Sequence, residues 1–200
     1  DRTGTVWIGT SGAGLFNYRV ATGRIRHFPR LEKHKEAPPG DITRILLSRT
    51  GKLYIATSRA GIYTHTPGKP GFEKFPGNPE KIPGSLGSSL VFDMAETRDG
   101  IVWAGSFGSG LFRIDPKTAT CENFIRKKDD TSGNLTLCDN RIFALHCDHR
   151  GFTWVGTAAG LNRFHYETRQ WHHYSVNHGL PGPVVYAIME EPAQPGQVPA

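Results

Sequence analysis

Two short clusters of histidine hold the residue types from which metal and catalytic sites are built. They are the segments 146–149, with the sequence HCDH, and 171–174, with the sequence WHHY. Because successive residues of a strand point to opposite faces of a sheet, His146 and Cys147 cannot bind one metal ion without distortion. The chain also lacks a Gly-x-Ser-x-Gly elbow, a phosphate-binding loop and a His-Glu-x-x-His helix. We therefore predict no metal ion, no cofactor and no catalytic residue.

A different set of side chains suits the binding of a ligand. A guanidinium such as that of Arg59 can hold two hydroxyl groups or a carboxylate through paired hydrogen bonds. A ring such as that of Phe107 can stack on the face of a pyranose. Polar side chains at the start of two predicted strands add further donors and acceptors. The predicted ligand-binding residues are Arg59, Phe107, Asp41, Arg44, Asn140 and Arg141.

An internal repeat that covers almost the whole chain positions these residues. The sequence Gly-x-x-Trp-x-Gly-Thr begins at Gly4, and variants of it begin at Gly51, Gly100 and Gly151, at steps of 47, 49 and 51 residues. A second glycine follows each copy, with an apolar pair after it in the first three copies. This repeat length is that of one four-stranded blade of a β-propeller. We therefore predict an all-β chain of four-stranded antiparallel blades.

Each copy divides into the strands of such a blade. In the second copy we predict an inner strand at 42–47, a strand with an aromatic residue at 52–57, a short strand at 62–65 and an outer strand at 72–75. The predicted blade pieces are 1–30, 41–76, 88–126 and 139–175, with a further inner strand at 184–191. We expect these four blades to be part of a larger ring. Closure of a four-bladed ring by the last strand is the alternative.

Most residues of the repeat have a structural explanation. The tryptophan fills the space between adjacent blades, and the small residue two positions later lets two sheets approach each other. The second glycine lies where a hairpin needs a positive φ. We therefore expect function in the loops, where the copies differ. In one such loop, Arg59 and Phe107 stand at matching positions, where the other copies carry the small residues Ser11 and Ala158.

Composition and charge narrow the classes of partner. The 24 Lys and Arg against 18 Asp and Glu give a net charge of +6 that is spread along the chain, so nucleic-acid binding is not expected. No apolar run approaches the roughly 20 residues that span a bilayer, so we expect no direct membrane contact. The sequence does not decide whether Cys121 and Cys138 form a disulfide. Because the chain starts within a repeat and has no initiator methionine, we expect it to belong to a longer protein.

The motif and the residues after it resemble a known family. Gly-x-x-Trp-Ile-Gly-Thr, followed by Gly-Leu-Phe-Asn-Tyr or Gly-Leu-Phe-Arg-Ile, is similar to the two-component regulator propeller repeat of bacterial sensor proteins. The second copy departs from it, with Tyr54 for tryptophan and Ala56 for glycine. The resemblance implies seven-bladed propellers in the periplasmic or extracellular part of membrane-bound hybrid histidine kinases. It also implies a response to oligosaccharides, as in many such sensors.

With this resemblance, we predict a non-catalytic sensor module that binds an oligosaccharide or another small molecule. One alternative is a structural or protein-docking scaffold whose partners are adjoining blades or a second copy of the chain, because repeat rings expose broad polar faces. The other alternative is a propeller-fold polysaccharide lyase or hydrolase, whose site would gather one residue from each of several blades.

Overall fold

The computed structural model describes residues 4–28, 38, 40–75, 86, 90–128 and 136–191. These residues form one three-stranded and three four-stranded antiparallel sheets, and in every sheet the strands pair in chain order. The described ranges hold no α-helix, and nothing in them is a helix long and apolar enough to cross a membrane. The prediction of an all-β chain of four-stranded antiparallel blades is confirmed.

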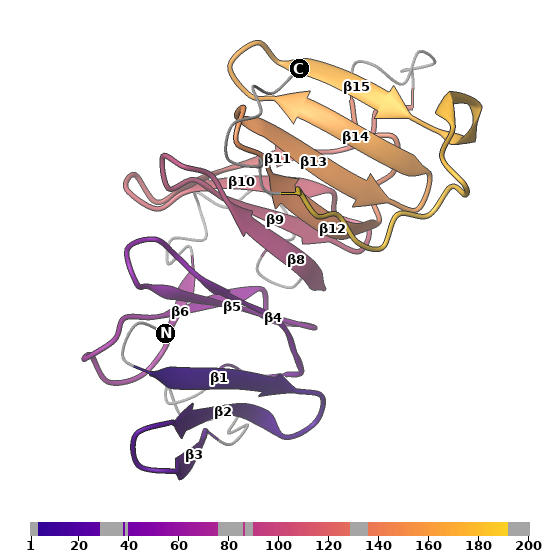
Figure 1. The fold of residues 1–200 in the computed structure, drawn as a ribbon. Helices are drawn as coiled ribbons and strands as arrows, with labels where there is room; N and C mark the ends of the chain where they lie inside the picture. Colours follow the sequence, from indigo (N-terminus) through magenta and orange to yellow (C-terminus); the bar gives the residue numbers. More distant parts are fainter. Residues whose placement is uncertain are drawn as a thin grey trace.

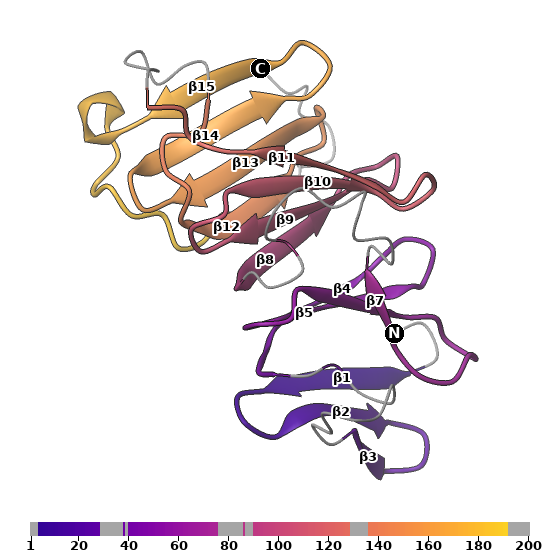
Figure 2. The same ribbon diagram turned by 180° about the vertical axis from the view of Figure 1, so that it is seen from behind.

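The four sheets are named blades 1 to 4. Blade 1 consists of β1 (Thr5–Thr10), β2 (Gly14–Arg19) and β3 (Arg24–Phe28), and blade 2 of β4 (Ile42–Leu47), β5 (Leu53–Thr57), β6 (Ile62–His65) and β7 (Glu73–Phe75). Blade 3 consists of β8 (Val91–Glu96), β9 (Val102–Ser106), β10 (Leu111–Asp115) and β11 (Thr120–Phe124), and blade 4 of β12 (Ile142–Cys147), β13 (Phe152–Thr157), β14 (Gly160–His165) and β15 (Gln170–Tyr174). A 3-10 turn, η3 (Val176–His178), follows. Figures 1 and 2 show the blades following one another in space in chain order.

The last residue of each motif closes the turn that follows it. The hydroxyl of Thr57 donates to the carbonyl of Gly61 and accepts the backbone N–H of Ala60, both at 2.9 Å. Ser106 donates to Gly110 in the same way, at 3.0 Å. The two glycines have φ of 77° and 81°, a region that residues with a Cβ disfavour. The predicted turn glycine is confirmed, and the hydroxyl explains why the motif ends in threonine or serine.

The motif tryptophan and glycine shape the seam between blades 3 and 4. Trp103 is 1% exposed, and its ring centroid lies 5.7 Å from that of Phe124 in its own blade and 5.8 Å from that of Phe164 in blade 4. Two residues later, a Cβ on Gly105 would overlap the branched side chain of Ile142. The repeated aromatic and glycine positions are therefore used for packing between blades, as predicted.

The inner strands share a β-bulge near their first residue. The register of pairing shifts by one residue within β4, β8 and β12. The residues inside these bulges are Thr43, Phe92 and Phe143. A bulge leaves its extra residue outside the ladder of hydrogen bonds and turns that side chain in a new direction. In each of blades 2, 3 and 4, one side chain is therefore turned out of the regular alternation at the same end of the inner strand.

The segment 184–190 takes the place of another inner strand without forming one. Val185 donates its N–H to the carbonyl of Thr157 at 3.0 Å and packs on Gly156, as Ile142 packs on Gly105 one blade earlier. Within the described ranges, no strand pairs with this segment. The predicted inner strand at 184–191 is thus corrected to an extended segment, because a strand needs a hydrogen-bonded neighbour.

Glu190 fastens this segment to blade 4. Its carboxylate lies against the ring of His149 and 3.2 Å from Nε2 of His146. Hydrogen bonds from His149 and then His146 lower the pKa of Glu190 to about 2. The histidines of the 146–149 cluster are therefore engaged with a carboxylate of the same chain.

We expect the contact of Glu190 to be lost in acid. Because its pKa in the folded protein lies below the ordinary 4.5, the stabilisation is complete above about pH 4.5 and disappears as the pH falls through about 2. Glu190→Gln is expected to release residues 184–190 already at neutral pH and to remove this pH dependence. Amide chemical shifts of Val185 measured by NMR check this, with Glu191→Gln as the matched control. Identical shifts in the Glu190→Gln variant and the wild type would contradict it.

Cys121 and Cys138 are free thiols, so the disulfide left open by the sequence is not formed. Cys121 packs against the core between blades 2 and 3, whereas Sγ of Cys138 lies 3.1 Å from the hydroxyl of Thr157 in blade 4. Burial raises the pKa of the Cys121 thiol to about 12. Both side chains are used in packing.

Candidate ligand-binding site

Four aromatic rings gather where the inner strands begin. The rings of Phe92 in β8, Phe143 in β12 and Tyr186 in the 184–190 segment form a row in space. Phe107, the residue directly after β9, lies beside the first two. The ring centroids are 5.6 Å apart for Phe92 and Phe143 and 4.9 Å apart for Phe143 and Tyr186. The centroid of Phe107 lies 5.9 and 5.8 Å from those of Phe92 and Phe143. We call these four side chains the aromatic cluster.

The aromatic cluster faces solvent. The exposed fraction is 39% for Phe92, 46% for Phe107 and 71% for Tyr186, and Phe143 is partly exposed. The bulges explain this exposure, because Phe92 and Phe143 are the residues that the bulges turn away from the sheet. Exposed apolar side chains in mutual contact mark a binding surface more often than scattered ones do.

Arg44, a predicted ligand-binding residue, is paired within the protein. Its Nε lies 2.8 Å from Oδ1 of Asp93, and its side chain is half exposed. The other oxygen of that carboxylate accepts the backbone N–H of Leu145 at 2.8 Å. One carboxylate therefore connects the inner strands of blades 2, 3 and 4. Asp93 directly follows Phe92, so this ion pair flanks the aromatic cluster.

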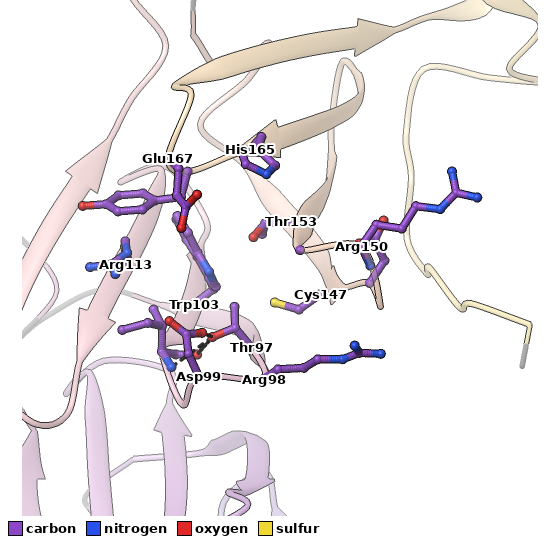
Figure 3. A pocket seen from close by; sticks show the side chains of 14 residues that line it. Thr97, Arg98, Asp99, Trp103, Arg113, Cys147, Arg150, Thr153, His165 and Glu167 are labelled. Carbon is purple, nitrogen blue, oxygen red and sulfur yellow. Dashed lines mark hydrogen bonds between the residues drawn. The ribbon is translucent and has the colours of Figure 1, made fainter. Parts of the chain in front are cut away.

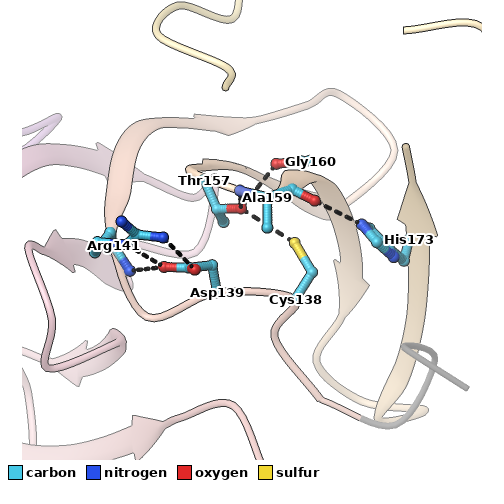
Figure 4. Close-up of polar contacts among 7 residues, drawn as sticks. All are labelled: Cys138, Asp139, Arg141, Thr157, Ala159, Gly160 and His173. Carbon is cyan, nitrogen blue, oxygen red and sulfur yellow. Dashed lines mark hydrogen bonds and ion pairs between the residues drawn. The ribbon is translucent and has the colours of Figure 1, made fainter. Parts of the chain in front are cut away.

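Arg141, another predicted residue, is held by Asp139. Figure 4 shows the guanidinium facing the carboxylate, with Nε and Nη2 at 2.9 and 2.8 Å from its two oxygens. The side-chain hydrogen bond from Arg141 is the main cause of the lowered pKa of Asp139. The backbone of Arg141 forms an isolated β-bridge with Phe107. This second ion pair therefore lies at the edge of the aromatic cluster.

Buried polar contacts fix the loop that carries this ion pair. The N–H of Cys138 donates to Oδ1 of Asn162 at 3.0 Å, and its sulfur meets the hydroxyl of Thr157. From the outer strand, Nε2 of His173 lies 3.2 Å from the carbonyl oxygen of Ala159, in the turn between β13 and β14 (Figure 4). These contacts hold the loop, and with it the ion pair of Asp139 and Arg141, against blade 4.

Asp41 and Asn140 hold the blades together at equivalent places. Oδ1 of Asp41 accepts the N–H of Gly12 at 2.6 Å. The carbonyl of Asn140 accepts the N–H of Gly108 at 3.0 Å, and its Oδ1 accepts the N–H of Arg126 at 2.7 Å. Each residue ties the start of one blade to the preceding blade. Their side-chain oxygens are therefore engaged in the fold itself.

Arg59 and Phe107 do not occupy matching positions, contrary to the prediction. The N–H of Phe107 donates to the carbonyl of Leu90, just before β8, and in blade 2 it is Ser58 that donates to Asp41, just before β4. Arg59 stands one residue later and is exposed. Three residues separate the motif from the turn glycine in both blades, 58–60 in blade 2 and 107–109 in blade 3, so the counterpart of Phe107 is Ser58 and the predicted match was one residue off.

Three aromatic residues of the cluster were missed by sequence reasoning. Of the predicted residues, the structure brings Phe107 and Arg141 together and pairs Arg44 with Asp93, the residue after Phe92. The three missed residues share a sequence signal. In the aligned segments VFDM (91–94), IFAL (142–145) and VYAI (185–188), the second residue is aromatic every time. The bulge that exposes this position has no sequence signal of its own.

A pocket of about 400 Å³ lies between blades 3 and 4 at the opposite end of their inner strands. Figure 3 shows Cys147 and Thr153 of blade 4 on one side of it and Trp103 on the other. Burial raises the pKa of the Cys147 thiol to about 12, so it is no activated nucleophile. Asp148 accepts Nε1–H of Trp154 at 2.7 Å, which gives it a structural role. Among the described residues, no group of His, Cys, Asp and Glu suits a metal ion.

Comparison with known proteins identifies the repeat. Residues 136–159, which include the ion pair of Arg141 and the first hairpin of blade 4, match the family described as two component regulator propeller. This segment of blade 4 is similar to a two-component regulator propeller repeat. The resemblance inferred from the motif is thereby confirmed.

This chain spans less than a quarter of the length of the relatives described here. Histidine kinase P4 of Formosa agariphila is 32% identical over 84 residues, which is 42% of this chain and 6% of that protein. The extracellular domain of a putative one component system of Bacteroides thetaiotaomicron superposes with a TM-score of 0.73 at 22% identity, covering 94% of this chain and 24% of that one. The extracellular domain of a putative hybrid two component system of the same organism superposes with a TM-score of 0.69 at 22% identity. This match covers 85% of this chain and 22% of that one. These structures confirm the fold of the propeller blades.

Proposed function

We propose that this chain is a non-catalytic ligand-sensing module of a two-component-type signalling protein, placed in its periplasmic or extracellular part, and that it recognises an oligosaccharide. The match to the two-component regulator propeller family and the similarity to a histidine kinase support the signalling context. The structural neighbours described as extracellular domains support the location.

The exposed aromatic cluster is the observation that carries this proposal. Ligand sites combine apolar and aromatic surface with a few placed polar groups. Here rings contributed by two blades and the segment after them form one surface, and the guanidinium of Arg141 lies at its edge. The apolar face of a sugar ring stacks on such rings while its hydroxyl groups bond to the polar groups. Phe107 and Arg141 are therefore retained as binding residues, and the aromatic cluster completes the site.

Titration calorimetry against a panel of neutral and acidic oligosaccharides tests the proposal. A panel member is expected to bind, and Phe107→Ala is expected to weaken its binding by about tenfold or more, as for an aromatic hot spot. Ile25→Ala, which removes a 68% exposed apolar side chain in blade 1, is the matched control and should bind as the wild type does. Failure of the whole panel would refute the proposal. Release of new reducing ends or unsaturated products would favour the lyase or hydrolase instead.

A further inference from the structure

The charge of the ligand can be inferred from the side chains around the aromatic cluster, on the basis of the function proposed above. Both arginines at its edge are already neutralised. Arg141 forms paired hydrogen bonds with Asp139, and Arg44 forms an ion pair of 2.8 Å with Asp93. An anionic ligand would meet guanidinium groups whose charge a neighbouring carboxylate already offsets. That carboxylate would also repel the ligand, so little net attraction for an anion remains.

The carboxylates of Asp139 and Asp93 also accept hydrogen bonds from the backbone. Asp139 also accepts the backbone N–H of Arg141 at 2.8 Å. Asp93 accepts the backbone N–H groups of Met94 and Leu145, each at 2.8 Å. A cationic ligand would therefore compete with several hydrogen bonds at either carboxylate. Neither sign of charge is favoured at this surface.

The surface instead offers the faces of aromatic rings for stacking, together with hydrogen-bond donors. A guanidinium has five N–H donors, and Asp139 takes only those on Nε and Nη2 of Arg141, so donors remain for hydroxyl groups. The hydroxyl of Tyr186, whose side chain is 71% exposed, is a further donor and acceptor. These groups match a sugar that carries hydroxyls and no charge.

We infer that the aromatic cluster binds a neutral oligosaccharide, held by stacking of its sugar rings on Phe92, Phe107, Phe143 and Tyr186. Centroid separations of 4.9 to 5.9 Å make the four rings one continuous surface that runs from β8 to the 184–190 segment. Because β8, β12 and the 184–190 segment each add one ring, the surface extends from blade 3 past blade 4. It therefore suits a chain of sugars better than a single one, and affinity should rise from mono- to trisaccharide.

Arg59 and Arg126 are exposed arginines that this assignment leaves out. Arg59 is one residue away from the position that Phe107 occupies in blade 3, and the charge of Arg126 acts on Asp139. No ion pair of either side chain is found within the described part of the chain. An acidic ligand would be received by these arginines, so Arg59→Ala and Arg126→Ala separate the two cases.

Calorimetry with neutral hexose trisaccharides and with hexuronate trisaccharides of the same linkages tests the inference. We expect a neutral trisaccharide to bind, with an affinity that changes less than about twofold between roughly 0.05 and 0.5 M salt, since no ion pair with the ligand is screened. Tyr186→Ala and Phe143→Ala should each weaken it by about tenfold or more. Arg59→Ala and Arg126→Ala should leave it unchanged. Because Tyr186 lies outside every strand, its variant remains informative if Phe143→Ala fails to fold.

The outcomes separate this inference from the proposed function. A hexuronate trisaccharide that binds about tenfold more tightly than its neutral counterpart, and loses that advantage in high salt, in Arg59→Ala or in Arg126→Ala, would overturn the neutral assignment and leave the sensor proposal standing. Neutral binding that Tyr186→Ala does not change would overturn the role of the cluster. Absence of binding by every trisaccharide would overturn both.

Discussion

Replacing Trp103 by alanine is expected to lower the free energy of unfolding by about 3–5 kcal/mol, the usual cost of deleting a large ring from a packed core. The side chain is 1% exposed, and its ring lies against Phe124, Phe164 and Tyr166, two of which belong to blade 4. Loss of the ring therefore leaves a cavity in the seam as well as in blade 3. Chemical denaturation followed by circular dichroism measures the change.

Trp154 provides the matched control for this prediction. It occupies the same motif position in blade 4, but it is only partly buried, and its Nε1–H donates to Asp148. No further blade covers that face within the described residues. Trp154→Ala should therefore cost clearly less than Trp103→Ala. An equal or larger loss at Trp154 would show that burial between blades is not what makes this position important.

Gly105→Ala is expected to lower the free energy of unfolding by about 1–3 kcal/mol, the range for adding a methyl group to a packed core. The added Cβ would overlap the side chain of Ile142 in the next inner strand. Blade 2 already shows how the conflict is resolved. Ala56 occupies the same motif position there, and the inner strand of the next blade begins with Val91, which is smaller than isoleucine.

The natural pairing of alanine with valine suggests a rescue. The double variant Gly105→Ala, Ile142→Val should recover most of the stability that Gly105→Ala loses, because the smaller side chain makes room for the methyl group. A double-mutant cycle in urea measures this coupling between the two sites. Additive losses in the double variant would mean that the glycine is required for its backbone conformation rather than for space.

The fold was predictable because its determinants recur. A tryptophan, a small residue and a turn glycine return at steps of 47 to 51 residues, and each has a packing or backbone reason that is independent of the other copies. The family followed from the same residues. The aligned inner strands even placed Val185 opposite Gly156, although the segment has no strand to pair with.

The site was less predictable because the bulge that exposes its recurring aromatic residues has no sequence signal of its own. Asp41 and Asn140 carry the residue types of a binding site, yet their side chains tie one blade to the preceding one. Arg59 was matched with Phe107, although the residue that takes the place of Phe107 in blade 2 is Ser58. Phe92 and Phe143 read as core residues of apolar strands, and only the bulge turns them to solvent.

The bulge also bears on how such a module can change its ligand over evolutionary time. Because the bulged residue makes no ladder hydrogen bond, Phe92 and Phe143 can differ in size and polarity while the blades around them stay alike. Mutation at these positions changes the surface offered to a ligand at little cost in stability. New specificities can thus arise one blade at a time on an unchanged scaffold.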